Sequence, residues 1–177
     1  SNLFNENSVF LELMKTKLLF NQNISAKISI NSTKASNDAI FNSIKMNFNI
    51  INGNINFDQT KFINDKIGML EMNNSNLIFK DSRFILKTDM LIDIQNSDKL
   101  YSYLQTSKKL RKPIKEIIIS LEYDILTSQV KINALKIDDI KAKKELETTI
   151  ENFLYYKDNN PYKTKRMLNK LLSIYFG

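Results

Sequence analysis

The clearest strand pattern in this chain lies in residues 43–62, SIKMNFNIINGNINFDQTKF. Apolar side chains stand at every second position from Ile44 to Ile50, which is the period of a half-buried β-strand. Asn52-Gly53 then favours a two-residue hairpin turn, because both positions of a type I′ turn need positive φ. The alternation resumes at Ile55 and Phe57. The stretch therefore predicts two antiparallel strands that share one apolar face.

The same two-residue period recurs in segments up to about residue 137. Alternating apolar and polar residues mark strands around 26–31, 84–95, 117–124 and 130–137. A one-residue phase change near Asn133-Ala134 predicts a β-bulge in the last of them.

Two polar stretches interrupt the alternation between residues 57 and 84. One is Asn73–Asn76, and the other is Lys80–Arg83. We interpret each as a break between strands, and the second as a hairpin turn.

Three helices are predicted from a switch of period and from capping residues. Ser97 is expected to be the N-cap of a short helix at about 97–108. The helix is expected to end before Pro113, because proline cannot lie far inside a helix. Apolar residues at helical spacing follow from Leu146, and Pro161 suits the first position of a last helix. Residues 1–23 fit either a strand pair or a short helix.

These elements predict an α+β fold. We expect about seven or eight strands in a mainly antiparallel, curved sheet with an open groove, a short helix, and two C-terminal helices packed on or beside the sheet. Three parts are expected: residues 1–23, a leading segment of a longer protein; residues 24–138, the sheet body; and residues 139–177, a C-terminal helical hairpin.

The composition argues against catalysis. The chain has neither histidine nor cysteine, which removes the usual general base, thiolate chemistry and most metal sites. Asp89 and Asp93 could suggest a pair of glycosidase carboxylates, but both are expected on the polar side of one strand. We therefore expect no enzyme, no metal and no cofactor.

Positive charge is concentrated in the last part of the chain. Residues 1–107 carry eleven basic and ten acidic side chains, whereas residues 108–177 carry fifteen and nine. A negatively charged partner, whether lipid headgroups or nucleic acid, would meet this last part first.

The predicted sheet has more apolar face than two helices can cover. Seven or eight strands at about 4.8 Å spacing span about 35 Å, and two helices cover roughly 20 Å of that. The sheet could fold over into a sandwich or barrel, continue into another sheet, or hold an apolar ligand on the bare face.

The order of the segments resembles that of a known family. NDAIFNSIKMNFNIINGNINFDQTKF is followed by KIGMLEMNNSNLIFKDSRFILKTDMLIDIQN, then by LYSYLQTSKKLRKPIKEIIISLEYDILTSQVKINALKID and a helical tail ending LLSIYFG. Over about residues 24–177 this succession resembles the C-terminal region of AsmA-like proteins, envelope proteins linked to outer-membrane biogenesis in Gram-negative bacteria.

The resemblance implies a non-enzymatic lipid-transport function. It implies a periplasmic segment of a longer protein that is anchored in the inner membrane by a helix outside this chain. Related bridge-like proteins are described as passing phospholipid acyl chains along the apolar inside of a curved sheet. On this interpretation the apolar face holds acyl chains, and the partners are phospholipids, a membrane surface and other envelope proteins.

Two sets of candidate residues follow from this interpretation. The groove lining is expected to consist of Ile44, Met46, Phe48, Ile50, Ile55, Phe57, Leu70, Met72, Leu77, Phe79, Phe84, Leu86, Met90, Ile92 and Ile94. Contact with headgroups or a membrane surface is expected from Lys108, Lys109, Arg111, Lys112, Lys163, Lys165, Arg166 and Lys170.

Each set also has a plainer interpretation. The apolar residues could form an ordinary core under the helices, the first basic run a solvated loop, and the last helix a cap on the sheet. A structural domain that docks another envelope protein through its sheet edge is the alternative function. Nucleic-acid binding is disfavoured, because no known motif is present and the aromatic residues lie mainly on the apolar side.

Overall fold

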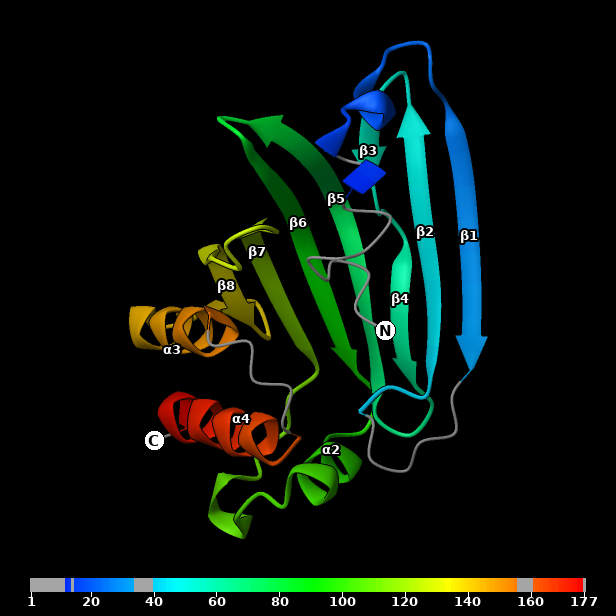
Figure 1. Ribbon diagram of the computed structural model, residues 1–177. Helices are drawn as coiled ribbons and strands as arrows, with labels where there is room; N and C mark the ends of the chain where they lie inside the picture. The colour runs from blue at the N-terminus through cyan, green and yellow to red at the C-terminus, as the bar shows by residue number, and fades with distance from the viewer. Residues whose placement is uncertain (1–11, 14, 34–39, 156–160, 177) are drawn as a thin grey trace.

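The computed structural model describes residues 12–13, 15–33, 40–155 and 161–176 of the 177-residue chain. In these residues nine antiparallel strands form one open sheet with helices on one face, which confirms the predicted α+β class (Figure 1). The strands are β1 (Ala26–Thr33), β2 (Ser43–Ile51), β3 (Asn54–Asn56), β4 (Thr60–Asn64), β5 (Gly68–Lys80), β6 (Arg83–Ile94), β7 (Glu116–Asp124), β8 (Val130–Ile137) and β9 (Ile140–Lys141). The helices are η1 (Leu18–Phe20), α2 (Ser97–Leu104), η2 (Lys108–Leu110), α3 (Lys144–Tyr155) and α4 (Pro161–Phe176).

Two short strands share one place in the sheet. The order is β1-β2-β3-β5-β6-β7-β8-β9, and β4 pairs with the same two neighbours as β3, namely β2 and β5. The sheet is therefore eight strands wide, and β1 and β9 stand at its two ends. Because it is one open layer, the sandwich and barrel alternatives are wrong for the described residues.

The turn that the sequence singles out has the expected conformation. Asn52 and Gly53 have φ of 50° and 74°, and Ile51 pairs with Asn54 across the turn. The second hairpin is confirmed at Asp81-Ser82, where both residues again have positive φ.

The prediction of a break between strands at residues 73–76 is wrong. Residues 73–76 lie inside β5, where the register against β6 shifts between Asn73 and Asn76 and makes a bulge. Ser75 stabilises this bulge, because its N–H and its hydroxyl both donate to Asp58 Oδ1, at 2.6 and 2.7 Å. The bulge predicted near Asn133 is confirmed by the register shift between β7 and β8.

The short helix begins one residue away from the predicted cap. Asn96 is the N-cap of α2, and its Oδ1 accepts from the backbone N–H of Lys99 at 2.9 Å. The Ser97 hydroxyl instead donates to the carbonyl oxygen of Ile114 at 2.8 Å. The helix ends at Leu104, so the predicted range of 97–108 also includes the start of η2.

The C-terminal part contains the two predicted helices, but it begins with the short strand β9. In the leading segment the described residues contain η1 and no strand, and residues 1–11 and 14 lie outside the described part of the chain. No helix in the described residues has the length and apolar character needed to cross a membrane.

Two apolar cores lie on the same face of the sheet. The first is formed under η1 and includes Phe48, Ile55 and Leu77. The second joins β6, β7 and β8 to the helices and includes Tyr101, Leu135 and Leu146. Figure 1 shows α3 beside β8, α4 below α3 and α2 below the lower end of β6, whereas β1 stands at the opposite side of the sheet.

Candidate functional site: an apolar sheet face and a basic helical end

The strand registers give the sheet one continuous apolar face. Because opposite residues in antiparallel strands point to the same face, partners can be followed from strand to strand. One row, called the central row below, crosses six strands without a polar residue: Ile44, Phe62, Leu70, Ile92, Ile117 and Ile137. A second row crosses the sheet nearer the Asn52-Gly53 turn: Ile50, Ile55, Leu77, Leu86, Tyr123 and Val130.

The structure brings the predicted groove residues together on this face. The predicted residues that lie in strands are on the apolar face, because their cross-strand partners are on that face. Phe57, between β3 and β4, packs into the first core. Most of them are nevertheless covered by the protein itself. The nine that are buried in the two cores are Phe48, Ile50, Ile55, Phe57, Met72, Leu77, Phe84, Leu86 and Ile94.

Six predicted residues remain accessible. Ile44 is 37 % exposed, and Met46, Leu70, Phe79, Met90 and Ile92 are half-buried. Phe79 lies apart from the others, packed against Phe84 and Phe20 with the Lys17 ammonium 4.7 Å from its ring centre. Of the other five, Ile44 and Met46 lie on β2, Leu70 lies on β5, and Met90 and Ile92 lie on β6.

The accessible apolar surface extends further than the sequence analysis indicated. Ile28 and Ile30 on β1 are 48 % and 47 % exposed, and they pair with Phe48 and Met46 on the apolar face. Phe62, Ile117 and Ile119 continue the half-buried surface and were also missed. The alternation at 26–31 was the available signal for the two β1 residues, since it places both isoleucines on one side of a strand.

The opposite face is mixed in character and carries most of the paired charges. Lys61 Nζ lies 3.3 Å from Glu71 Oε2, and Lys87 Nζ lies 3.1 Å from Glu122 Oε1. The bond from Lys87 lowers the pKa of Glu122 below its ordinary value. This face, called the polar face below, also carries Ile51, which is 58 % exposed.

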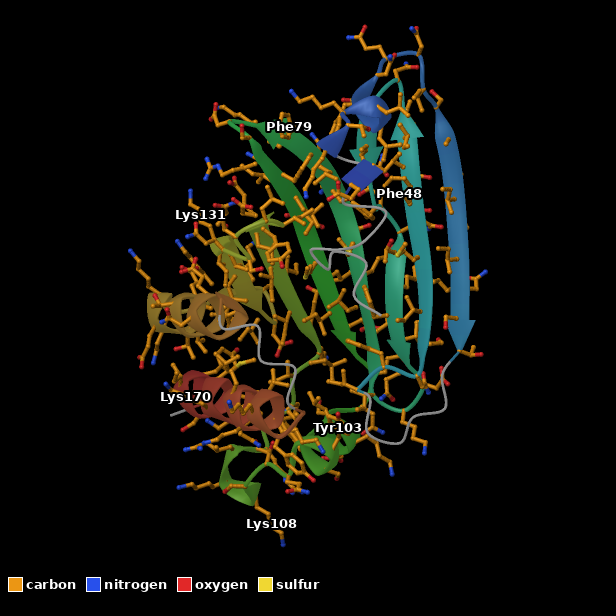
Figure 2. All side chains as sticks on the ribbon, in the orientation of Figure 1. Phe48, Phe79, Tyr103, Lys108, Lys131 and Lys170 are labelled. Atoms are coloured by element: carbon orange, nitrogen blue, oxygen red, sulfur yellow. The ribbon has the colours of Figure 1, made fainter. Side chains whose placement is uncertain are left out.

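The predicted basic residues gather at one end of the molecule. Residues 97–115, with α2 and η2, pack against α4, and we call these two segments the basic end. Asn169 joins them, because its Nδ2 donates to the Leu104 carbonyl oxygen at 2.7 Å and its Oδ1 accepts from the Thr106 hydroxyl at 2.7 Å. Figure 2 shows Tyr103, Lys108 and Lys170 at this end.

Two lysines of the basic end lie over aromatic rings. Lys165 Nζ is 4.2 Å from the ring centre of Tyr103, and Lys112 Nζ is 5.2 Å from that of Phe176. Lys112 also donates to the Phe176 carbonyl oxygen at 3.3 Å. Each contact links the α2–η2 segment to α4, so these cations fix the position of the last helix.

The buried phenol of Tyr101 lies under the basic end. Its hydroxyl donates to the carbonyl oxygen of Lys112, and its side chain is 1 % exposed. Burial, with smaller contributions from the negative charges of Asp138 and Asp98, raises the pKa of Tyr101 to about 12. Burial also raises the pKa of Tyr175.

A shallow hollow of about 340 Å³ lies beside α4, lined by Ile140, Lys141, Ala142, Lys143, Tyr175 and Phe176. None of the predicted groove residues lines it. The two carboxylates considered for catalysis, Asp89 and Asp93, lie on the polar face and bind the amides of Asn74 and Gln95. Within the described ranges, no group of three acidic residues could hold a metal ion.

No protein-family model, curated protein or solved structure matches this chain.

Proposed function

We propose that this chain is a non-enzymatic lipid-holding domain whose apolar face binds acyl chains next to β1 and β2. One observation carries the proposal. Ile28, Ile30 and Ile44 leave large apolar side chains exposed at the edge of a face that continues, row by row, into half-buried apolar residues. Soluble proteins seldom leave such a patch without a use.

The accessible length of the central row fits one acyl chain. From Ile44 on β2 to Ile92 on β6 the row crosses three strand spacings, or about 14 Å at about 4.8 Å each. One leaflet of a bilayer has a hydrocarbon depth of about 15 Å, half of the usual core. A lipid tail could therefore lie across the strands along this row.

Binding of an acyl chain to this face does not require a fixed polar group. Transfer of each CH₂ from water to an apolar surface is favourable by about 0.8 kcal/mol, so contact along the row is enough to hold a tail. Met46 and Met90 lie in the half-buried part of the face. Flexible thioether side chains adapt their shape to a ligand that slides.

The resemblance to AsmA-like proteins supplies a biological setting for the proposal. In that setting the chain would be a periplasmic segment of a longer envelope protein, and it would hold or conduct phospholipid acyl chains during outer-membrane biogenesis.

Lipid retention by matched glutamate variants tests the proposal. Ile30→Glu and Ile44→Glu place a charge on the apolar face at exposed positions, and Ile51→Glu does the same on the polar face of β2. We expect phospholipid that copurifies with the wild type, measured by mass spectrometry of an organic extract, to fall at least about tenfold in the first two variants, since a buried charge disfavours tail binding.

The control variant should keep its lipid, and circular dichroism should show that all three variants are folded. A wild-type protein that neither copurifies with lipid nor binds a fluorescent phospholipid would contradict the proposal. Equal losses in all three variants would contradict it as well.

A second function, docking of another β-protein, is favoured by the edge strand β1. All eight of its residues are exposed, and its eight pairs with β2 run without a bulge. It contains no proline and one charge, Lys27, so it lacks the usual protection of an edge strand against pairing. Such an edge can accept a strand from a partner.

Photo-crosslinking separates the two functions. A crosslinking amino acid at Asn31, on β1, should capture an envelope protein in cells if the edge is a docking site, whereas the same group at Lys131, on β8, should not. Equal labelling from both positions would count against docking.

A further inference from the structure

We propose that the basic end docks the molecule on an anionic lipid surface. This inference goes beyond lipid holding, because it concerns a different part of the molecule and would stand if the apolar face bound no tail. It is carried by the distribution of charge. The two segments of the basic end, 97–115 and 161–176, contain ten basic side chains and one acidic one, Asp98.

The charge of the basic end exceeds that of the whole chain. Its net charge is +9, whereas the chain has +7, so all other residues together sum to −2. Two segments that are far apart in sequence thus meet in space and hold the entire positive excess. A concentrated field of this kind attracts a negative surface.

The cations are placed to act on such a surface. Lys108, Lys109, Arg111, Lys112 and Lys115 are all exposed. None of the three ion pairs found in the described residues involves a cation of the α2–η2 segment. Their charge is therefore not neutralised by acidic side chains of the described protein.

Helix α4 adds a second row of cations. Lys163, Arg166 and Lys170 are spaced by three and four residues, so they share one side of the helix, and all three are exposed. The apolar side, with Leu172, packs into the second core. Tyr162, in the first turn, is 82 % exposed, and tyrosine is a side chain that favours the headgroup level of a membrane.

A lipid surface fits this end better than a nucleic acid. Proteins that bind single strands use open aromatic rings on which bases stack. Here the rings of Tyr103 and Phe176 already lie under the ammonium groups of Lys165 and Lys112. What remains for a partner is a set of exposed cations, which suits the headgroup phosphates of an anionic bilayer.

Vesicle cosedimentation tests the proposal with two matched triple variants. The first combines Lys108→Ser, Lys109→Ser and Lys170→Ser at the basic end. The second combines Lys27→Ser, Lys45→Ser and Lys131→Ser at exposed lysines of the sheet. Both variants lose three charges, so they differ only in where the charge is removed.

We expect the wild type to bind vesicles that contain phosphatidylglycerol, not vesicles of phosphatidylcholine alone, and to dissociate as salt rises. Each lysine near the surface contributes about fivefold to binding, so the first variant should lose on the order of 100-fold in affinity. The second should lose less than about fivefold. The Ile44→Glu protein should still bind the vesicles, which separates this proposal from lipid holding.

Three results would overturn the proposal. The first is a wild type that does not distinguish the two kinds of vesicle. The second is an equal loss in both triple variants. The third is tighter binding to a single-stranded oligonucleotide than to the anionic vesicles, with the same loss in the first variant, which would assign the basic end to nucleic acid.

Discussion

The hydroxyl of Thr60 makes both hydrogen bonds that Asn47 of β2 would otherwise make with a neighbouring strand. Thr60 Oγ1 donates to the Asn47 carbonyl oxygen at 3.1 Å and accepts from the Asn47 N–H at 3.0 Å. Thr60 is 2 % exposed and is the first residue of β4, which follows β3 along the edge of β2. A single side chain thus keeps β2 continuous across an interruption in its partner.

Replacement of this hydroxyl should destabilise the protein. Thr60→Val keeps the shape of the side chain but leaves two buried backbone groups without a partner, so we expect a loss of about 1–3 kcal/mol in the free energy of unfolding. Urea unfolding followed by circular dichroism measures it. Thr60→Ser keeps the hydroxyl and should lose clearly less, and an equal loss in both variants would contradict this account.

Gly53 should not tolerate a side chain. It has φ of +74°, and a Cβ at this position would lie 2.4 Å from the Phe20 carbonyl oxygen. Gly53→Ala should therefore cost more than about 1 kcal/mol, because the strained φ and the backbone clash add together. Thermal unfolding checks this, with Asn52→Gly as the control. That control should change stability little, since glycine accepts the φ of 50° at Asn52.

The contact between α2 and α4 should depend on Asn169. Its side chain binds the Leu104 carbonyl oxygen and the hydroxyl of Thr106, which is 2 % exposed. Asn169→Leu should cost about 1–3 kcal/mol in stability, because both partners lose a hydrogen bond away from water. Hydrogen exchange should show faster opening of α4 in this variant, whereas Ser173→Ala, at an exposed position on the same helix, should leave exchange unchanged.

The free energy of unfolding should decrease at high pH because the phenol of Tyr101 ionises. Its pKa is raised from 10.0 to about 12, so the folded state holds the phenolic proton more tightly than the unfolded chain does. This contribution is complete below pH 10 and is lost as the pH rises from 10 towards 12.

Tyr101→Phe isolates this contribution. The variant should be less stable than the wild type at neutral pH, since it loses the bond to the Lys112 carbonyl oxygen. Its stability should then fall less steeply between pH 10 and 12, and the two urea-unfolding curves should converge. Parallel pH profiles for the two proteins would exclude the role of this phenol.

Local signals in the sequence predicted most of the sheet. Alternation set the strand faces, Asn52-Gly53 fixed one hairpin, and the phase change at Asn133 marked a bulge. The run Asn73–Asn76 was misinterpreted because four polar residues look the same in a turn and in a bulge. What keeps this run in β5 is the bond between Ser75 and Asp58, which is separated from it by 17 residues in sequence.

The site was only partly predictable for a related reason. A two-residue period shows which side chains share a face, but it does not show what covers that face. Phe48 and Met46 follow the same pattern, yet Phe48 is buried in a core and Met46 is half-buried. That difference depends on what packs on the face, because Phe48 lies in the core under η1, whereas the other helices pack against β6, β7 and β8 and leave Ile30 and Ile44 exposed.

The basic end carries +9 while all other residues sum to −2, so the centre of positive charge lies towards α2 and α4 and not at the middle of the molecule. In the field above a charged bilayer such a particle rotates while it diffuses, and it arrives with α2 and α4 leading. Orientation before contact would then be a property of the folded chain alone, and electric birefringence of the protein in dilute buffer would register it without any membrane present.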